Sequence, residues 1–487
     1  MKTLNDLKTI KSIGNKQIAE SVAKRTVSEI PAYKKFLATN GLSSLPNQFA
    51  DLPLTSKNSY VLPSDHLDLL AGDDQTVFYH RSSSLNNSLY WPQPKLTKEL
   101  IILFKHYLEQ NYQIHTRKSV CIVGAYMGSW IGGQNLTYYL ENITGYIDYP
   151  LSIFTPGNNV EEIVQFILKH NHYADQFIVF LCPSFIAYIF DAVEAMGIRD
   201  QFPFFKLRFL TVGESFTEFF REHINKTCAI NEGSQSLFSI YGSADTGMIG
   251  AESLASITIR QMLYHSQLET LHHGTLPHLF HFLSEDAYIE EINEEIFITK
   301  WQGIPIVRYN LHDKVKFYSW KELRKFVLSH KLGGPQKELS HYIIEKAGEN
   351  LPDIIALFGR SDSSLKLQDT FISEEILDHI MNSKLLSEFL TGHFRASVEY
   401  DNHDHQYLGL LLELKPSTTL SDELIHDLYN IIINYLCGML REFKADYEEI
   451  YKKFDNDKSR QILRLNICQW PSLSKELSAK TKRRGFK

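Results

Sequence analysis

The residues best suited to chemistry lie in the segment LFSIYGSADTGMIGAE at positions 237–252. An apolar run ends at Tyr241, and a loop through Gly242 and Ser243 then leads to the carboxylate of Asp245. Glycine lets a backbone approach a ligand closely, a serine hydroxyl can bond phosphate, and an aspartate can hold Mg²⁺ against phosphate. The loop therefore favours nucleotide binding, with an ordinary strand-to-turn connection as the alternative.

A second polar segment, RSSSLNNSLYW at 81–91, is rich in groups that hydrogen-bond phosphate. Arg81 and Lys95 add positive charge at or near its ends. The hydroxyl and amide side chains belong to Ser82, Ser83, Ser84, Asn86, Asn87 and Ser88. The segment contains no glycine, so its backbone N–H groups approach phosphate less freely than those of a glycine-rich loop.

Short apolar runs alternate with helical patterns between about residues 100 and 300. Strands are predicted at 119–126, 176–181, 207–212 and 237–241, and helices at 159–170, 184–196 and 216–226. Strands separated by helices form parallel β-α-β units, whose ligands bind at the carboxyl ends of the strands. The loops after Val212 and Tyr241 both lie at such ends, so both are candidates for ligand binding.

The pattern changes after about residue 250. Charged and apolar residues alternate in predicted strands at 287–292, 294–300 and 314–320, as in half-exposed antiparallel sheets. A smaller α+β unit is predicted beyond Gly359, with strands at 363–367, 393–400 and 406–414 and helices at 373–382 and 421–437. We therefore expect an α/β protein with a large N-terminal domain (1–359), containing mixed parallel sheets and a β-rich section, and a small α+β C-terminal domain (360–487).

Eight segments, in order along the chain, resemble motifs of the adenylate-forming enzymes, specifically their phenylacetate-CoA ligase branch. They are LPLTSKNSY (52–60), VGAYMGSWIGGQN (123–135), TPGNN (155–159), LCPSFIAYIFDAVEAMGI (181–198), VGESFTEFFREHI (212–224), YGSAD (241–245), IPIVRYNLHDKVKF (304–317) and LFGRSDSSLKL (357–367). The resemblance implies that a carboxylate attacks the α-phosphate of ATP, which gives an acyl-adenylate and pyrophosphate. A thiol or an amine would then accept the acyl group.

The resemblance also implies which residues hold the nucleotide. Glu214 would help frame the adenine, Tyr241 would stack on it or pack beside it, and Asp313 would accept hydrogen bonds from the ribose hydroxyls. The full set is Gly213, Glu214, Ser215, Tyr241, Gly242, Ser243, Ala244, Arg308 and Asp313, together with the polar side chains of 82–88. The implied cofactors are ATP and Mg²⁺, with CoA or phosphopantetheine as the acyl acceptor.

Catalytic roles follow from the same resemblance. Asp245, where the family usually has Glu, would hold Mg²⁺, and Arg360 would approach the nucleotide from a hinge. Lys480 or Lys482 would neutralise charge during adenylation, although neither is in the family's Gly-Lys context. Asp362 would flex between adenylating and thiol-accepting orientations of a mobile C-terminal domain.

A pocket for the acid is implied by the Gly- and aromatic-rich segment at 123–135. Its candidate lining residues are Tyr126, Met127, Trp130, Gly132 and Gly133. Two glycines beside bulky aromatic side chains fit a flat or elongated apolar acid, although ordinary packing of a buried turn produces the same pattern.

Composition and missing motifs exclude several other classes of protein. The net charge of −7 argues against nucleic acid as a partner, and no apolar run is long enough to cross a membrane. Five scattered cysteines and a polar N-terminus indicate a reduced, cytoplasmic protein. The signatures of P-loop NTPases, Rossmann dehydrogenases, serine hydrolases and zincins are absent.

Histidines crowd the segment that contains His272, His273, His278 and His281. No cysteine lies nearby, so a surface or core cluster is favoured over a metal site.

Two alternatives stay open at this point. A ligase that makes amides would share every nucleotide-binding residue with one that makes thioesters. A relative without catalysis would only bind nucleotide, acyl group or a protein partner. The features that favour it are the glycine-free loop, Asp245 and the lack of a Gly-Lys context at Lys480 and Lys482. The expected partners are a small carboxylic acid and, as a further option, an acyl or peptidyl carrier protein. The oligomeric state is open, with a dimer among the options.

Overall fold

The computed structural model describes residues 7–72, 76–82, 89–231, 233–266, 276–329, 337–361, 364–368, 370–416, 418–473 and 485–486. The chain divides into two compact units, and the main boundary follows Ser361. Each unit has its own sheet and its own buried residues.

The first unit is built on a sheet of 14 described strands. They are β1 Thr9–Ile10, β2 Ser12–Gly14, β3 Thr55–Ser56, β6 Ser119–Val123, β7 Leu151–Phe154, β8 Gln176–Leu181, β9 Leu207–Val212, β10 Leu237–Ser243, β11 Gly247–Ala251, β12 His278–Phe282, β13 Ala287–Ile292, β14 Glu295–Lys300, β15 Ile306–Tyr318 and β16 Ile354–Arg360. Strands β4 (Thr76–Ser82) and β5 (Leu89–Pro94) form a separate hairpin.

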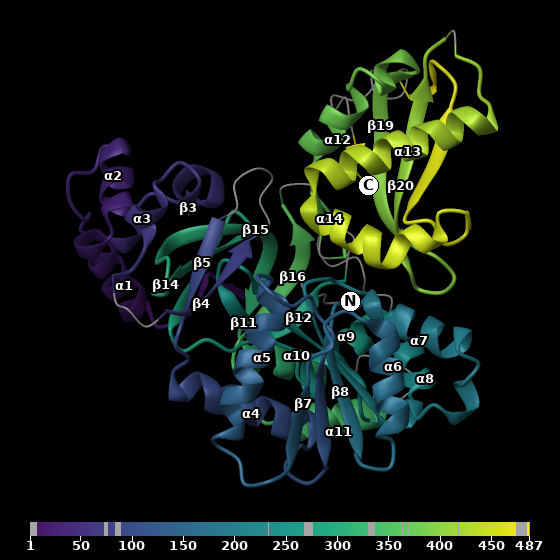
Figure 1. The fold of residues 1–487 in the computed structure, drawn as a ribbon. Helices are drawn as coiled ribbons and strands as arrows, with labels where there is room; N and C mark the ends of the chain where they lie inside the picture. The colour runs from purple at the N-terminus through teal and green to yellow at the C-terminus, as the bar shows by residue number, and fades with distance from the viewer. Residues whose placement is uncertain are drawn as a thin grey trace. The chain divides into compact units, whose positions relative to one another are not determined.

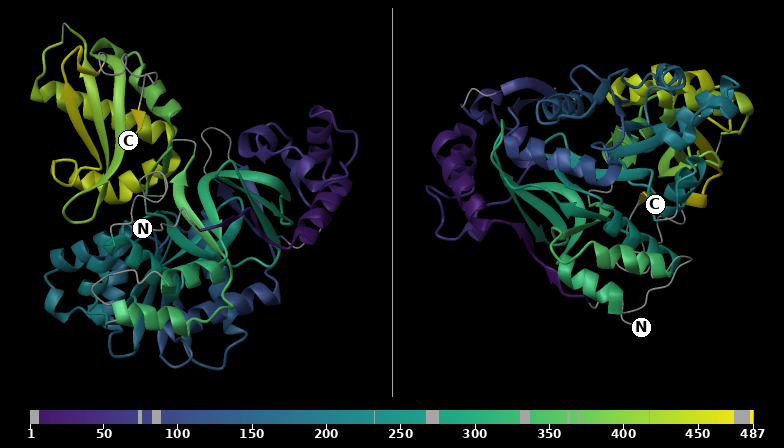
Figure 2. Two further views of the ribbon diagram at one scale, coloured as in Figure 1. Left: turned by 180° about the vertical axis from the view of Figure 1, so that it is seen from behind. Right: turned by 90° about the horizontal axis from the view of Figure 1, so that it is seen from below.

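Helices surround this sheet (Figures 1 and 2). They are α1 Lys16–Glu29, α2 Pro31–Thr39, α3 His66–Leu69, α4 Lys98–Tyr112, α5 Ile131–Thr144, α6 Val160–Lys169, α7 Phe185–Ala195, α8 Glu218–Thr227, α9 Leu254–His265, α10 Trp320–Ser329 and α11 Lys337–Lys346. Polar caps fix where several of them begin: Asn159 accepts from the Glu162 N–H before α6, and Thr217 from the Phe220 N–H before α8.

One end of the sheet is parallel, in the order β7-β6-β8-β9-β10. Every residue of β6 and β8 is buried, as expected where helices cover both faces of a sheet. Apolar residues of α4 and α5 pack with those of β6, β8 and β10 in one core cluster. The four strands predicted in this region exist, although the first ends at Val123 and the fourth extends to Ser243.

The rest of the sheet is antiparallel from β10 through β11, β12, β16, β15, β14 and β13. The prediction that β13 and β14 are half exposed is wrong, because β13 is buried from Ala287 to Ile289 and at Glu291, and β14 is buried from Ile296 to Thr299. The third predicted strand of the region was placed too late. It begins at Ile306, and the helix α10 already begins at Trp320.

The N-terminal helix α1 contacts β13, β14 and β15 (Figure 2). The short strand β3 adds to this corner by parallel pairing with β15 at Tyr309↔Thr55. The corner therefore supports the strand that carries Arg308, Tyr309 and Asp313.

The second unit is an α+β module. Its strands are β17 Leu365–Leu367, β18 Thr370–Ile372, β19 Leu390–Tyr400, β20 Gln406–Leu414, β21 Leu463–Cys468 and β22 Gly485–Phe486, and its helices are α12 Glu374–Met381, α13 Asp422–Met439 and α14 Arg441–Asp446. The sheet order is β21-β20-β19-β22. The predicted elements at 373–382, 393–400, 406–414 and 421–437 all exist, whereas β21 was not predicted.

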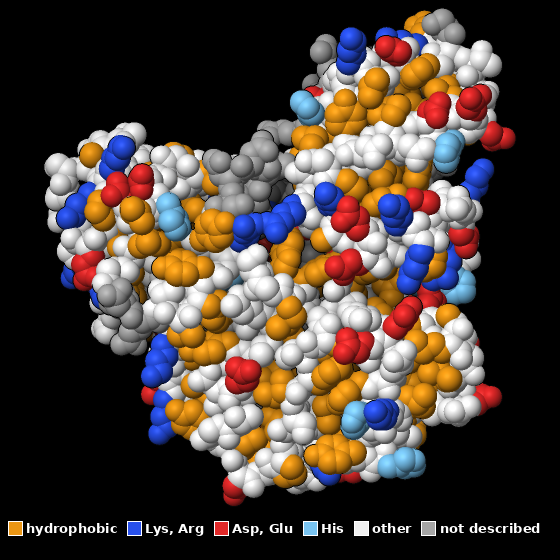
Figure 3. Space-filling view, viewed as in Figure 1, with side chains coloured by type: hydrophobic (Ala, Val, Ile, Leu, Met, Phe, Trp, Pro, Cys, Tyr) orange, Lys and Arg blue, Asp and Glu red, His pale blue; other side chains and the backbone are white. Residues whose placement is uncertain are grey.

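The face in Figure 3 carries apolar side chains interspersed with charged and polar ones. Singly exposed apolar groups such as Leu67 and Phe219 are ordinary on a protein surface. Within the described residues, no helix combines the length and apolar character needed to span a membrane.

Candidate active site

Two tyrosine–aspartate hydrogen bonds connect β10 and its loop to β15 in opposite directions. The Tyr241 hydroxyl donates to Oδ2 of Asp313 at 2.6 Å. The Tyr309 hydroxyl donates to Oδ2 of Asp245, also at 2.6 Å. Each stretch of chain thus supplies one tyrosine and, four residues later, one carboxylate. The structure thereby brings together two predicted aspartates that are 68 positions apart in sequence.

Arg360 completes this group, which we call the Tyr–Asp cluster: Tyr241, Asp245, Tyr309, Asp313 and Arg360. Asp313 on β15 is the direct neighbour of Arg360 on β16. The Arg360 guanidinium donates to Oδ1 of Asp313 at 3.3 Å and to the Leu311 carbonyl at 2.6 Å. The predicted hinge arginine therefore lies beside the predicted ribose ligand.

The loop between β10 and β11 is held by its backbone. A bulge at Tyr241 and Gly242 shifts the pairing register, and a Cβ on Gly242 would lie 2.4 Å from the Gly247 carbonyl oxygen. Only glycine fits here without displacing the β11 backbone. The hydroxyls of Ser243 and Thr246 bond each other at 2.9 Å, which closes the loop.

Two side chains from elsewhere bind the carbonyls of this loop. His80 Nε2 lies 3.0 Å from the Ala244 carbonyl oxygen, and Gln302 Nε2 donates to the Asp245 carbonyl at 2.5 Å. Both carbonyl groups are therefore directed toward protein donors, while the Asp245 side chain points to Tyr309. His80 belongs to β4, the strand that leads into the polar segment 83–88.

Burial keeps Tyr241, Tyr309 and His80 neutral, which is the form in which each donates its hydrogen bond. Burial and the adjacent Asp313 carboxylate raise the pKa of Tyr241 well above its usual value. Burial and the Asp245 carboxylate do the same for the pKa of Tyr309. Burial also lowers the pKa of His80, so the imidazole is neutral near pH 7 and donates from Nε2.

The residues at Asp245 are compatible with a Mg²⁺ ion. Within the described part of the chain, Tyr309 is the side-chain donor to Asp245, and it uses only Oδ2. The described residues contain no group of three or more His, Cys, Asp or Glu side chains that could hold a metal. A single carboxylate matches how Mg²⁺ is bound in nucleotide sites, where water and phosphates supply the other ligands.

The predicted adenine loop, Gly213–Glu214–Ser215, follows the carboxyl end of β9 and precedes α8. Gly213 has φ +97°, a left-handed conformation that favours glycine. Glu214 is buried. β9 pairs with β10 in parallel register, from Leu237↔Phe209 to Ile240↔Val212, so this loop and the Tyr241 loop follow neighbouring strand ends.

Arg308 is placed away from the Tyr–Asp cluster. Its guanidinium donates to the carbonyls of Ala50 and Leu52 and forms an ion pair with Glu290 at 3.2 Å. The structure therefore places Arg308 among contacts that hold the segment before β3 onto β15.

The residues predicted to line the acid pocket lie together in the loop after β6 and in the first turn of α5. The rings of Tyr126 and Trp130 have centroids 5.9 Å apart. A Cβ on Gly133 would lie 2.3 Å from the Tyr126 carbonyl oxygen and 2.7 Å from Met127 Sδ, whereas one on Gly132 would lie 3.7 Å from its nearest neighbour. Gly133 thus permits close packing of α5 against the turn at 125–127.

Several predicted site residues lie outside the described residues. They are Ser83, Ser84, Asn86, Asn87, Ser88, Asp362, Lys480 and Lys482. Ser82, the last residue of β4, pairs with Leu89 of β5, and Arg81 bonds Tyr90 through its guanidinium at 2.8 Å. The polar segment is therefore flanked by the two strands of one hairpin.

Three groups were not foreseen from sequence: the hydroxyl of Tyr309, His80 and Gln302. The Tyr309 role has one usable signal, the repeated spacing of a tyrosine four residues before each aspartate. Nothing in the local sequence marks His80 or Gln302, because each acts on a loop more than 50 positions away.

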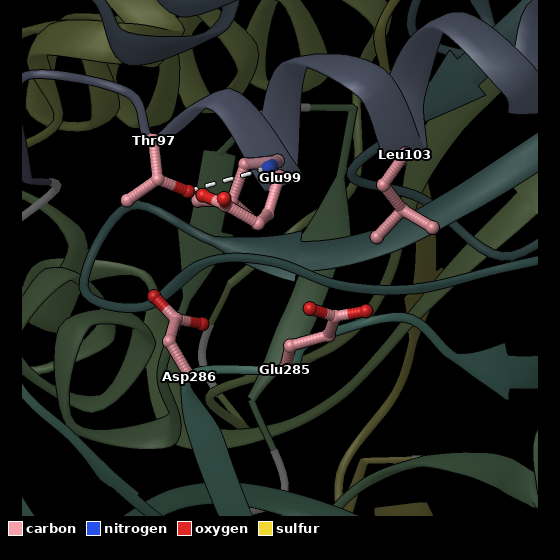
Figure 4. A pocket seen from close by; sticks show the side chains of 6 residues that line it. Thr97, Glu99, Leu103, Glu285 and Asp286 are labelled. Carbon is pink, nitrogen blue, oxygen red and sulfur yellow. Dashed lines mark hydrogen bonds between the residues drawn. The ribbon is translucent and has the colours of Figure 1, made fainter.

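One described cavity is separate from the cluster. It has a volume of about 210 Å³ and is lined by Thr97, Glu99, Leu100, Leu103, Glu285 and Asp286 (Figure 4). Three carboxylates border it, and no residue of the Tyr–Asp cluster does.

The two described histidines of the predicted cluster are buried. His278 bonds the backbone of Phe216, and His281 bonds Ser253 and Pro352. His272 and His273 lie outside the described residues.

No family model matches the sequence, and a search of the curated proteins finds no match. The structure of a 2-hydroxyisobutyryl-CoA ligase in complex with 2-HIB-AMP and CoA is similar, with a TM-score of 0.62 at 11% identity, covering 97% of this chain and 89% of that one. An acyl acid amido synthetase in complex with 2,4-DB gives 0.44 at 11% identity, covering 97% and 91%. A malonyl-CoA ligase with methylmalonyl-CoA and AMP gives 0.42 at 11% identity, covering 94% and 83%. This chain shares the overall fold of that 2-hydroxyisobutyryl-CoA ligase, and the predicted fold class is confirmed.

Proposed function

We propose that this protein activates a carboxylic acid with ATP, forming an acyl-adenylate and pyrophosphate, and then transfers the acyl group to a thiol such as CoA or a carrier-protein phosphopantetheine. The observation that carries the proposal is the Tyr–Asp cluster, which joins the carboxyl end of β10 and the loop after it to β15 and to the end of β16, in a fold shared with a CoA ligase. Ligands of α/β sheets bind at such ends. The phenylacetate-CoA ligase branch, suggested by the eight sequence motifs, is part of this proposal.

In this proposal the cluster mainly binds and orients the nucleotide. Asp313 accepts hydrogen bonds from ribose hydroxyls, and Arg360 holds that carboxylate from the neighbouring strand. Tyr241 is buried and stacks on Phe280, with ring centroids 5.5 Å apart, so it offers a rigid wall beside the nucleotide. The chemistry needs little more from the protein than positioning and charge stabilisation.

Asp245 would hold Mg²⁺, which supplies positive charge to the phosphates when bound. Tyr309 fixes the carboxylate for this role by binding Oδ2. Family members usually have Glu at this position, and the Glu side chain is one methylene longer than that of Asp245. The backbone of the Ala244–Asp245 loop must therefore set how far the Asp245 carboxylate reaches toward Mg²⁺. His80 and Gln302 hold that backbone through its carbonyl groups.

The variant Asp313→Ala tests the proposal. It should abolish carboxylate-dependent pyrophosphate release, because the ribose then loses its acceptor and Arg360 loses its ion pair with Asp313. Thermal unfolding and circular dichroism should show that the variant is folded. Full activity in the folded variant would contradict the ribose assignment.

The acceptor is tested by offering CoA, a phosphopantetheinylated carrier protein and simple amines to the trapped adenylate. A thioester product supports the proposal. An amide product would assign the protein to the amide-forming class instead.

A further inference from the structure

A network of buried charged side chains lies behind the predicted adenine loop. It comprises Glu218 and Arg221 of α8, Glu252 after β11, Arg260 of α9 and His278 of β12. Each of these side chains belongs to a residue that is at most 3% exposed. Burying four charges is costly unless each is paired, so this network needs an explanation beyond packing.

Within the network, every charge has a partner. Arg221 binds Glu218 through Nε at 3.1 Å and Glu252 through Nη2 at 2.6 Å, and Arg260 binds Glu218. Glu252 also accepts from the Ser239 N–H of β10 at 2.9 Å. Burial opposes ionisation of Glu252, yet Arg221 and His278 outweigh it and lower its pKa to about 2. Glu252 is therefore ionised near pH 7, and it joins the network to β10, the strand that carries Tyr241.

Two members of the network bind the backbone of Phe216. Arg260 Nη2 donates to the Phe216 carbonyl at 2.9 Å, and His278 Nε2 lies 2.9 Å from the same carbonyl oxygen and 3.2 Å from the Phe216 nitrogen. His278 Nδ1 faces Glu252 at 3.6 Å, which is too long for a hydrogen bond. Nε2 donates to the Phe216 carbonyl when it carries the proton and accepts from the Phe216 N–H when it does not. We call this pair of contacts the Phe216 clamp.

The ring of Phe216 is held as firmly as its backbone. The Arg221 guanidinium lies 4.8 Å from the ring centroid, and the His278 ring meets it edge-on at 4.8 Å. Phe216 follows Glu214 by two residues in the connection between β9 and α8. A fixed Phe216 leaves little freedom to the loop between it and Gly213.

We propose that Arg260 and His278 are positioning residues that fix the Gly213–Glu214–Ser215 loop in the conformation that receives the adenine. The inference rests on the proposed function, since it assigns the loop to the base of ATP. Buried ion pairs contribute little net stability compared with apolar replacements, but they specify geometry. The Phe216 clamp fixes the backbone at Phe216, directly after the predicted adenine loop.

The test compares three variants in the full-length protein. His278→Leu removes the contact of Nε2 with the Phe216 backbone, and His278→Gln restores a side-chain amide that can accept from the Phe216 N–H or donate to the Phe216 carbonyl. His281→Leu is the matched control, because His281 is an equally buried histidine of β12 whose bonds go to Ser253 and Pro352. Each protein is titrated with ATP and Mg²⁺, and hydrogen exchange is followed for the peptide that contains Phe216.

We expect His278→Leu to weaken ATP binding about tenfold, the effect of one buried hydrogen bond, with kcat at saturating ATP changed less than about twofold. His278→Gln should lie within about threefold of wild type, and His281→Leu within about twofold. Exchange in the loop peptide should accelerate in His278→Leu alone. If His278→Leu fails to fold, Arg260→Lys is the alternative variant. Lysine keeps a positive charge beside Glu218 but lacks the second guanidinium N–H group, which donates to the Phe216 carbonyl. ATP binding should weaken by about the same factor.

Equal effects of His278→Leu and His281→Leu on ATP binding would overturn the inference, as would unchanged binding in His278→Leu. Accelerated exchange with unchanged ATP binding would show that the clamp holds the loop but does not serve the nucleotide. A folded wild-type protein that binds no ATP would overturn the proposed function itself. The hydrogen-exchange measurement does not depend on ATP binding, so it would still show whether the clamp holds the loop.

Discussion

At the scale of single residues, the cluster depends on neutral donors that hold two carboxylates in place. Tyr241 and Tyr309 are both deeply buried, and each donates its hydroxyl to the aspartate of the other segment. Asp245 was predicted from the glycine and serine before it as well as from the family resemblance, and Asp313 was predicted from that resemblance. The contacts of the two tyrosine hydroxyls were not predicted, because they join segments that become neighbours only in the folded sheet.

Tyr309→Phe should lower kcat for pyrophosphate release about tenfold, because Asp245 loses the hydrogen bond that orients it for Mg²⁺. The change is measured at saturating ATP and Mg²⁺. Tyr318→Phe is the control, since Tyr318 is a buried tyrosine of the same strand, nine positions further on. Equal rates in the two variants would show that the Tyr309 hydroxyl has no part in the reaction.

The buried His281 predicts how stability depends on pH. Burial lowers its pKa from 6.5 to about 4, although the bond to the Pro352 carbonyl opposes this. Between these values the unfolded chain binds a proton that the folded protein does not. The free energy of unfolding should therefore decrease as pH falls from about 6.5 to about 4, by roughly 3 kcal/mol from this group.

Urea unfolding at a series of pH values checks this prediction. His281→Gln should reduce the dependence on pH within that window, whereas the exposed His115→Gln should leave it unchanged. An unaltered slope in His281→Gln would mean that other groups are responsible for the acid sensitivity.

At the scale of elements, the parallel strands were predictable because each is a short apolar run with a helical pattern beside it. The strands β8 and β9 match their predicted bounds. The antiparallel strands were harder, because both faces of β14 are covered and the expected alternation of exposure does not arise. The early part of β15 was missed, since positive-φ residues at Arg308 and His312 interrupt its regular pattern.

Neighbouring glycines of α5 provide a matched pair of substitutions. Gly133→Ala should lower the free energy of unfolding by about 2 kcal/mol, because its Cβ would meet the Tyr126 carbonyl oxygen at 2.3 Å. Gly132→Ala should change it by less than about 0.5 kcal/mol, because its nearest neighbour is at 3.7 Å.

Chemical denaturation measures both variants. If the turn at 125–127 lines the acid pocket, Gly133→Ala should also raise KM for the acid more than KM for ATP. Equal stability of the two variants would contradict the packing of α5 described above.

At the scale of the whole molecule, two units are described, and the proposed reaction assigns residues of both to the adenylation step. Sequence alone indicated the order of the motifs and the change of pattern near Gly359. It did not indicate the clamp, which requires residues of α9 and β12 to meet at the backbone of Phe216.

The proposed catalytic lysines belong to this scale. The double variant Lys480→Ala/Lys482→Ala should slow pyrophosphate release about 100-fold through loss of charge stabilisation, with ATP binding changed less than about threefold. The control is Lys452→Ala/Lys453→Ala, a pair of exposed lysines in the same unit. Wild-type rates in the first variant would remove both lysines from the mechanism.

The most direct test of adenylation is pyrophosphate release from ATP and Mg²⁺ across a panel of aryl, fatty and amino acids, with hydroxylamine present to trap acyl-adenylate. The account predicts release that depends on the carboxylic acid and a hydroxamate derived from the same acid. A folded protein that binds ATP but releases no pyrophosphate with any acid, and forms no hydroxamate, would contradict it and indicate a relative that only binds nucleotide.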